Sequence, residues 1–326
     1  MATNKRKVML PHTMGQQGID VMQARDDIET IIYPAGISQP ELLPRLVDIA
    51  GIALSGTPFR QKEINAAAAM QVVARIGVGY DAVEVPALTA RRVPLLTAGT
   101  ANSTSVAEQA FHLIIALAKK NRTLHALVTE DKWAQRHTAP PMELSGKTIL
   151  IVGFGRIGTR TARRCAAFDM TVLIHDPYIK QDNIRSAGYQ IADDLDAALP
   201  KADIVCIHCP KSPETVGMFN ATRLGLMKRG AFIVNTARGG IIDEPALYKA
   251  LTSGHLAGAG LDVFEQEPTP PDNPLLSLEN VISSPHMAGV TVEAIAAMAV
   301  ATSLNILSVL DGTPNRENTI NPEVYD

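Results

Sequence analysis

The sequence predicts an α/β protein built from two doubly wound domains, each with a parallel sheet. The chain has 326 residues, 46% of them hydrophobic, which is enough for two domains with buried cores. Short β-rich runs alternate with helical runs through the first hundred residues, and a second series of the same kind begins at Lys147. This alternation is typical of parallel strands joined by crossover helices.

The first series begins with the strand-like "KVML" and continues through "IETIIY", "GIAL" and "VVARIG". The helical segments "GIDVMQAR", "QKEINAAAAM" and "VEVPALTARR" lie between them. We expect a long, largely buried helix over 105–121, because apolar residues cover most of its circumference. Residues 122–147 lose the alternation and contain the prolines of "TAPPMELSG", so an extended arm is expected there.

The second series begins with "TILIVG", a near-continuous apolar strand, followed by the helix "RIGTRTARRCAAF" and the strand "MTVLIHD". It continues through "ADIVCIH", "AFIVNTA", "PALYKALTSG", "AGAGLDVF" and "VISSPHMAG". The last predicted helix, "VEAIAAMAVATSLNILSVLDG", follows the second sheet and could pack on either domain.

Composition argues against a nucleic-acid partner. The net charge is -3 with no basic stripe, and the 7 Phe, 6 Tyr and 1 Trp offer few platforms for stacking bases. We expect a small-molecule partner. The apolar run after the N-terminal basic residues is too short for a secretory signal, and no stretch looks long enough to span a bilayer, so no membrane partner is expected.

The chain contains three cysteines, an odd number that does not suit a disulfide framework. A reducing compartment, and hence a cytoplasmic location, is the expectation. Two of the cysteines fall in "CIHC", which superficially suggests a metal site. That segment completes a buried strand whose side chains alternate between faces, and no second cysteine pair exists to finish a tetrahedral site, so we expect no metal.

The segment "GFGRIG" places Gly153, Gly155 and Gly158 between a predicted strand and a predicted helix. These positions suit a tight turn, close approach of a diphosphate to the backbone, and close packing of the helix on the strand. The following strand ends at Asp176, where a carboxylate accepts hydrogen bonds from ribose hydroxyls and repels a 2'-phosphate. Since no Arg follows it, the cofactor predicted is NAD, preferred over NADP.

Three motifs downstream, "NTARGGIIDEPAL", "AGLDVFEQEP" and "SSPHMAG", complete an ordered set with "GFGRIG". Together they closely resemble the D-isomer-specific 2-hydroxyacid dehydrogenase family, which includes phosphoglycerate, glycerate, glyoxylate/hydroxypyruvate and D-lactate dehydrogenases. The segments "ARIGVGYDAVEV" and "GTANSTSVAEQA" also look like motifs of that family. The resemblance covers nearly the whole chain.

The resemblance implies that Arg238, Glu267 and His286 form a catalytic trio. The residue types suit the reaction: a guanidinium holds the carboxylate of a 2-keto acid and polarises the ketone. An imidazole exchanges the proton, and a carboxylate beside it favours the protonated ring and fixes its orientation. The cofactor carries the hydride.

The resemblance also implies further cofactor contacts, among which Asp262 resembles the residue that hydrogen-bonds the nicotinamide carboxamide. The whole additional set is Thr104, Arg156, Ile157, His208, Cys209, Pro210, Thr215, Thr236, Ala237, Asp262 and Gly289.

The resemblance implies a flavodoxin-like substrate domain over 1–99 plus 291–326 and a Rossmann NAD-binding domain over 100–290. The cleft between them would close around the reactants. The substrate contacts that carry over are Ser55, Gly56, Val78 and Gly79. The helix over 105–121 and the arm around Trp133 resemble the family's dimerisation elements, so a homodimer is expected.

The identity of the substrate is less constrained. Phosphoglycerate-using members commonly have an Arg just before the serine that matches Ser55, whereas this chain has Leu54. Hydroxypyruvate or glyoxylate is therefore preferred, with 3-phosphoglycerate as the alternative, for which Arg60, Arg75 or an arm residue of the partner subunit would supply the missing cation. A second alternative, of a different class, is an NAD-sensing corepressor, which keeps the same trio. Glu267 disfavours the formate dehydrogenase branch, which has Gln at the matching position.

Overall fold

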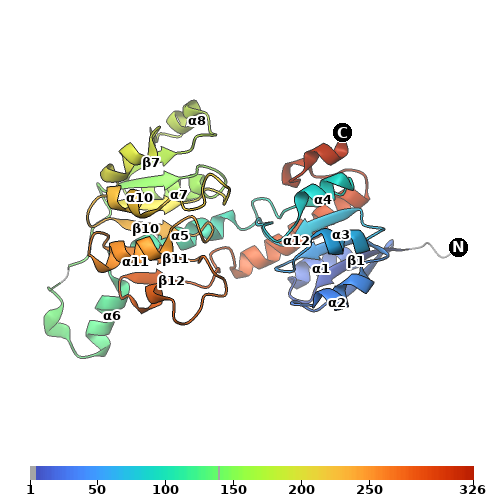
Figure 1. Ribbon diagram of the computed structural model, residues 1–326, viewed down its shortest axis with the longest axis horizontal. Helices are drawn as coiled ribbons and strands as arrows, with labels where there is room; N and C mark the ends of the chain where they lie inside the picture. Colours follow the sequence, from blue (N-terminus) through green and yellow to red (C-terminus); the bar gives the residue numbers. More distant parts are fainter. Residues whose placement is uncertain (1–4, 139) are drawn as a thin grey trace. The chain divides into compact units, whose positions relative to one another are not determined.

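The computed structural model describes residues 5–138 and 140–326. It divides the chain into two compact units, Met1–Asn102 with Val290–Asp326, and Ser103–Gly289. Each unit contains one parallel sheet covered by helices (Figure 1). The predicted fold class, two doubly wound α/β domains, is confirmed.

The first unit has a five-stranded sheet in the order β2-β1-β3-β4-β5. This is the flavodoxin-like order. Its strands are β1 Arg6–Pro11, β2 Ile28–Tyr33, β3 Ile49–Leu54, β4 Val72–Arg75 and β5 Leu95–Leu96. Its helices are α1 Gln16–Gln23, α2 Gln39–Leu42, α3 Gln61–Ala66, α4 Val85–Ala90 and α12 Val292–Leu310, with 3-10 turns at Leu43–Arg45, Arg316–Asn318 and Pro322–Tyr325.

The second unit has a seven-stranded sheet in the order β12-β11-β10-β9-β6-β7-β8. Its strands are β6 Thr148–Val152, β7 Thr171–His175, β8 Gln190–Ile191, β9 Ile204–Ile207, β10 Phe232–Asn235, β11 Gly258–Leu261 and β12 Val281–Ser283. Its helices are α5 Ser103–Ala118, α6 Asn121–Thr129, α7 Gly158–Ala166, α8 Gln181–Ser186, α9 Leu195–Ala198, α10 Ala221–Leu226 and α11 Glu244–Thr252, with 3-10 turns at Trp133–Gln135, Leu199–Lys201 and Pro274–Ser277.

The order of the second sheet places its first strand, β6, next to β9. The chain moves outward from β6 through β7 and β8, and then returns to continue on the other side through β9 to β12. Such a switch point leaves a crevice at the carboxyl ends of the central strands, where ligands bind in open α/β sheets. The glycine turn follows β6 and therefore lies at this point of the sheet.

Central strands β9, β10 and β11 are buried along their whole length, as expected for parallel strands covered on both faces. Helix α5 packs across β10 and β11 and has ten buried residues, in agreement with the largely buried helix that its sequence predicts. It begins two residues earlier and ends three residues earlier than the predicted range of 105–121.

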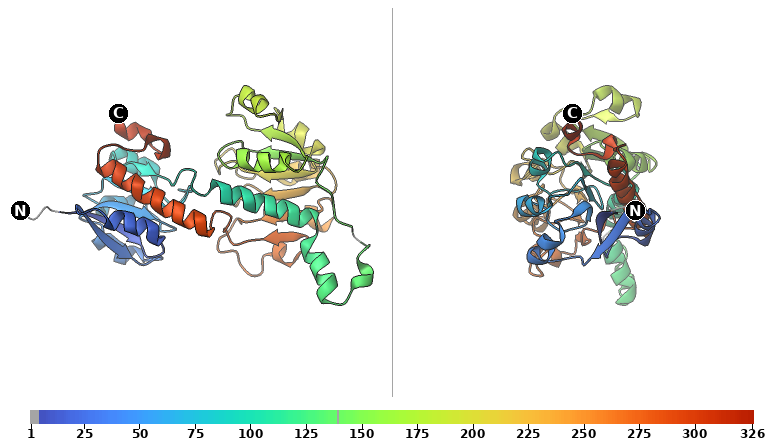
Figure 2. Two further views of the ribbon diagram at one scale, coloured as in Figure 1. Left: turned by 180° about the vertical axis from the view of Figure 1, so that it is seen from behind. Right: turned by 90° about the vertical axis from the view of Figure 1, so that its right-hand side faces the viewer.

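Two expectations from the sequence were wrong. The segment over 122–147 was expected to be irregular, but α6 occupies Asn121–Thr129. None of its residues is buried, and Figures 1 and 2 show it away from the sheet of its own unit. No stretch was expected to be long enough for a membrane, yet α12 has 19 residues with a mean hydropathy of 1.7. It packs against α1, β3 and β4 of its own unit, so its apolar face belongs to that core.

Candidate active site

The turn between β6 and α7 contains three glycines. At two of them, Gly153 and Gly158, the space is too small for any side chain. Gly153 has φ +98°, and a Cβ there would lie 2.6 Å from the backbone nitrogen of Cys209. A Cβ on Gly158 would lie 2.0 Å from the carbonyl oxygen of Gly153. These approaches bring α7 close to β6 and to the loop after β9.

Gly155 differs from the other two glycines, because a Cβ built on it would meet no atom of the described chain (5–138 and 140–326) within 4 Å. The protein itself therefore does not require glycine here. The open space lies over the backbone at the beginning of α7, whose free N–H groups and positive dipole end suit an anion. This arrangement fits the diphosphate of a dinucleotide.

Asp176 lies directly after β7, beside the glycine turn. Its Oδ2 accepts a hydrogen bond from the Phe154 backbone N–H over 2.7 Å, and its Oδ1 accepts one from Tyr178 N–H over 2.9 Å. The carboxylate thus holds the turn from the neighbouring strand. Lone pairs remain on both oxygens, so the position also suits the predicted bonds from ribose hydroxyls.

Most of the other predicted cofactor residues lie at the carboxyl ends of strands of the second sheet. The loops after β9, β10 and β11 and the turn before α7 contain Arg156, Ile157, His208, Cys209, Pro210, Thr215, Thr236, Ala237 and Asp262. Thr104 lies in the first turn of α5, and Gly289 lies at the end of the second unit.

Two buried polar atoms in these loops, His208 Nδ1 and Thr236 Oγ1, have no hydrogen-bond partner among the residues that the structure describes. Buried polar atoms are normally paired, so these two atoms fit a loop completed by a ligand. Burial lowers the pKa of His208 to about 4, which keeps the ring neutral at neutral pH.

The "CIHC" segment does not form a metal cluster: within the described residues, no three His, Cys, Asp or Glu side chains are grouped to hold an ion. Burial raises the pKa of Cys209 to about 11 and that of Cys206 well above its usual value. Cys206 Sγ lies 3.3 Å from His208 Nε2. These thiols are protonated at neutral pH and are poor metal ligands.

Glu267 and His286 are in direct contact. His286 Nδ1 lies 2.7 Å from Glu267 Oε2, and Glu267 Oε1 accepts a hydrogen bond from Phe264 N–H over 3.0 Å. With an ionised carboxylate, the proton of the neutral ring sits on Nδ1, and Nε2 is left to face a reactant. The imidazole is 47% exposed and the carboxylate 37%, so both groups are accessible.

His286 has φ +55°, a left-handed conformation that costs a non-glycine residue ~1–2 kcal/mol. Its backbone N–H donates to the carbonyl oxygen of Asp262 over 2.7 Å. Non-glycine residues with positive φ are concentrated at active sites, where neighbouring contacts impose the conformation. The surroundings of His286 therefore determine where its ring lies.

Arg238 follows β10, the neighbour of β11 in the sheet. Its Nη1 donates to the Ala237 carbonyl oxygen over 2.7 Å. Asn235, the last residue of β10, is 2% exposed and was not among the predicted site residues. Asn235 Nδ2 donates to the carbonyl oxygen of Arg238, and its Oδ1 accepts from Ala237 N–H, both over 2.9 Å. Asn235 thus closes the turn that carries Arg238; its place in "VNTARGG" was the available signal.

Besides its predicted contact with nicotinamide, Asp262 holds the loop that carries His286. Its side chain is fully buried at the end of β11, and its carboxylate accepts hydrogen bonds from Ser284 and from the backbone amides of Met287 and Ala288. Asp262 N–H donates to the carbonyl oxygen of Asn235 over 3.0 Å. Two buried polar residues on neighbouring strands thus hold the Arg238 and His286 loops.

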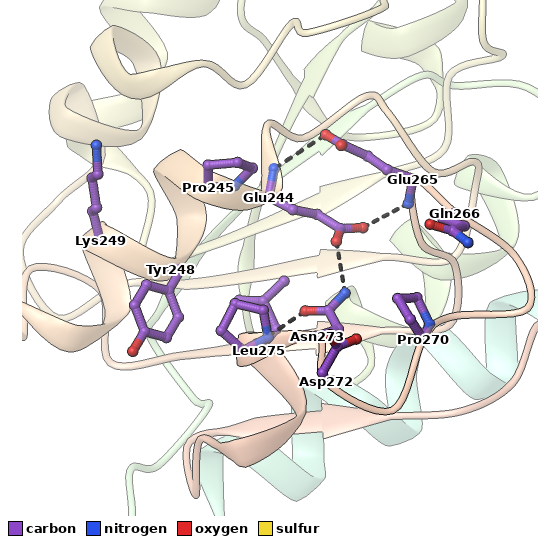
Figure 3. A pocket seen from close by; sticks show the side chains of 11 residues that line it. Glu244, Pro245, Tyr248, Lys249, Glu265, Gln266, Pro270, Asp272, Asn273 and Leu275 are labelled. Atoms are coloured by element: carbon purple, nitrogen blue, oxygen red, sulfur yellow. Dashed lines mark hydrogen bonds between the residues drawn. The ribbon is translucent and has the colours of Figure 1, made fainter.

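The loop that carries Glu267 is attached to the first turn of α11. Glu244 accepts hydrogen bonds from Glu265 N–H over 2.6 Å and from Asn273 Nδ2 over 2.9 Å (Figure 3). A pocket of about 520 Å³ lies beside these residues and is also lined by Tyr248 and Leu275. None of the predicted site residues lines it.

The four predicted substrate residues lie in the first unit. Ser55 and Gly56 follow β3, and Val78 and Gly79 follow the neighbouring strand β4. Arg75 connects the end of β3 to the loop after β4: its Nε donates to the Gly79 carbonyl oxygen over 2.7 Å and its Nη1 to that of Leu54 over 3.2 Å.

A glycine turn at the switch point of a parallel sheet, with an acidic residue ending the next strand, defines a dinucleotide-binding Rossmann domain. Residues 111–288 match the family model of the D-isomer specific 2-hydroxyacid dehydrogenase, NAD binding domain. The chain belongs to the D-isomer-specific 2-hydroxyacid dehydrogenase family.

Known relatives include a D-3-phosphoglycerate dehydrogenase of Archaeoglobus fulgidus, 36% identical over 97% of this chain and 59% of its own length. A glyoxylate reductase of Korarchaeum cryptofilum is 34% identical over 98% of this chain and 97% of its own. The crystal structure of D-lactate dehydrogenase from Aquifex aeolicus, complexed with NAD and lactic acid, covers 96% of this chain and 99% of its own with a TM-score of 0.86 and 25% identity. The chain spans less than two thirds of the phosphoglycerate dehydrogenase.

Proposed function

We propose that the protein is an oxidoreductase that transfers a hydride between NAD(H) and a small D-2-hydroxy acid or its 2-keto acid. The observation that carries the proposal is the 2.7 Å contact between Glu267 and His286 in the unit that also contains the glycine turn. Membership of the family, whose relatives include reductases and dehydrogenases of such acids, supports the reaction class.

In the direction of reduction, bound NADH would supply the hydride to the keto carbon. His286 gives a proton from Nε2 to the carbonyl oxygen, and Glu267 stabilises the protonated ring through Nδ1. Arg238 holds the substrate carboxylate and polarises the ketone with its planar guanidinium. In the direction of oxidation, the neutral imidazole accepts the hydroxyl proton.

The residues of the first unit support a small substrate. The position before Ser55 is Leu54, and Arg75 donates to the backbone carbonyl oxygens of Gly79 and of Leu54 itself. A phosphate on the substrate requires a cation with donors directed at it. We therefore propose hydroxypyruvate or glyoxylate as the substrate and 3-phosphoglycerate as the alternative.

A spectrophotometric screen tests this proposal. NADH oxidation is measured with hydroxypyruvate, glyoxylate, pyruvate and 3-phosphohydroxypyruvate. We expect the highest kcat/KM with hydroxypyruvate or glyoxylate. A higher value with 3-phosphohydroxypyruvate would contradict the substrate assignment, and no oxidation with any of the four would favour the corepressor alternative, in which NAD binding serves partner recognition.

We propose that NAD is preferred over NADP. Asp176 and Asp193 both line a cavity of about 140 Å³ at the end of β7, so a 2'-phosphate placed there would meet two carboxylates. We expect a higher kcat/KM with NADH than with NADPH, and a shift of this ratio toward NADPH by ~10-fold, equal to ~1.4 kcal/mol, in Asp176→Ala. A wild-type preference for NADPH would contradict the assignment.

We propose that the protein is a homodimer in which α6 and the following arm contact the second copy. None of the residues of α6 is buried, and Val128 and Trp133 are each 61% exposed. A nine-residue helix without packing is marginal in water, and exposed large apolar side chains mark interaction surfaces. We expect sedimentation at twice the chain mass of 34.9 kDa, and a shift toward monomer in Trp133→Glu. Sedimentation of the wild type as a monomer would refute it.

We propose a cytoplasmic location, because all three cysteines are free thiols, as is usual in a reducing compartment.

A further inference from the structure

The loop that carries His286 is attached to one buried carboxylate on both sides of the histidine. Before it, Ser284 Oγ donates to Asp262 Oδ1 over 2.5 Å. After it, Met287 N–H donates to Oδ1 and Ala288 N–H to Oδ2, each over 2.9 Å. His286 thus lies between contacts that converge on the same side chain.

Helix α5 adds a further contact to this loop. Gln109, on α5, donates from Nε2 to Ser284 Oγ over 3.1 Å. Helix α5 has ten buried residues and packs across β10 and β11, so it is a rigid support. The serine hydroxyl thereby accepts from α5 and donates to the end of β11. A hydroxyl that makes both bonds has little freedom to rotate.

The position of the imidazole depends on this attachment. The left-handed backbone of His286 is not favoured by the residue itself, so the flanking contacts must maintain it. The ring must also stay within hydrogen-bond distance of Glu267, which belongs to a different loop. A small displacement of residues 284–288 would therefore change the contact between Nδ1 and the carboxylate, and with it the aim of Nε2.

We propose that Ser284 and Gln109 are positioning residues for His286: their hydrogen bonds to each other and to Asp262 keep the imidazole against Glu267 and directed at the reacting oxygen. The proposal rests on the proposed function, because it concerns the ring that exchanges the proton. It assigns to Ser284 and Gln109 no contact with cofactor or substrate.

The kinetic test uses Ser284→Ala, Gln109→Leu and the double variant with the best substrate of the screen. We expect kcat to fall about tenfold in each single variant, since displacements near 1 Å cost up to ~100-fold in well-oriented reactions. KM and the NADH Kd should stay within about twofold. The double variant should lose little more than either single variant, because both changes break one chain of bonds.

Two further variants serve as controls. Ser284→Thr keeps the hydroxyl and should restore most of the lost kcat. Ser283→Ala removes the exposed hydroxyl of the preceding residue and should leave kcat unchanged. A normal kcat in Ser284→Ala, or an equal loss in Ser284→Thr, would overturn the proposal.

Amide hydrogen exchange gives a readout that does not depend on activity. In Ser284→Ala and Gln109→Leu, the amides of Met287 and Ala288 should exchange faster, while those of β6 and β9 and the thermal midpoint stay as in the wild type. Unchanged exchange at these two amides would overturn the proposal, and so would faster exchange throughout the second unit, which indicates general destabilisation. If the wild type reduces no 2-keto acid, the proposed function fails, while the exchange data still decide whether the two residues hold this loop.

Discussion

His286→Ala lowers kcat for 2-keto acid reduction by ~10²–10⁴-fold, because the developing alkoxide loses its proton donor. The NADH Kd should change little, since the glycine turn and Asp176 lie on other strands, at the ends of β6 and β7. The measurement is steady-state NADH oxidation, together with NADH binding followed by fluorescence. This is the largest effect expected from a single side chain of the trio.

Two companion variants make this result specific. Glu267→Gln keeps a polar group beside Nδ1 but removes the charge, so kcat should fall less than in His286→Ala. His112→Ala removes an exposed imidazole from α5 and should leave kcat unchanged. If His286→Ala retained wild-type turnover, the histidine would not be the proton donor, whatever its distance from Glu267.

Gly155→Val weakens cofactor binding strongly without unfolding the protein. A Cβ at this glycine lies more than 4 Å from every atom of the part of the chain that the structure describes, so the protein itself leaves room for it. A diphosphate approaching the backbone at this turn would meet the new methyl groups. We expect the NADH Kd to rise by about 100-fold, equal to ~2.7 kcal/mol.

Thermal unfolding separates cofactor exclusion from damage to the fold. Without NADH, Gly155→Val should unfold at the wild-type temperature. NADH at about 100 times its wild-type Kd stabilises the wild type by ~2.7 kcal/mol, and this gain should fall to ~0.4 kcal/mol in the variant. Gly225→Ala, a change at another open glycine, in α10, should leave NADH binding unchanged. Tight NADH binding by Gly155→Val would show that the diphosphate does not lie at this turn.

Local patterns were sufficient for most of the fold. Parallel strands can be predicted from short apolar runs. The glycine turn can be predicted from its spacing together with the strand before it and the helix after it. Helix α6 could not be predicted in this way: its residues bury no side chain, so its sequence carries no core-facing stripe. The length of α12 was underestimated because polar residues such as Asn305 interrupt its apolar run in the sequence; in the structure Asn305 is buried within the first unit.

In the candidate site, the sequence predicts some residues, and others can be found only from the structure. Motifs locate the residues that have distinctive chemistry, such as His286 and Glu267. They do not reveal which other side chains hold these residues, because those partners are distant along the chain. Gln109 and Ser284 are 175 residues apart, and only the packing of α5 over the sheet brings them together. Asn235 was missed for a related reason: an amide at a strand end is usually read as part of a turn.

The central claim is that His286, supported by Glu267, exchanges a proton with a 2-keto acid while Arg238 holds its carboxylate. A crystal structure of the protein with NADH and oxamate, a nonreactive 2-keto acid mimic, tests it most directly. We predict that His286 Nε2 lies ~2.6–3.2 Å from the oxygen that represents the ketone, with the Arg238 guanidinium on the carboxylate. An oxamate bound with its ketone-like oxygen out of hydrogen-bond reach of His286 would contradict the claim.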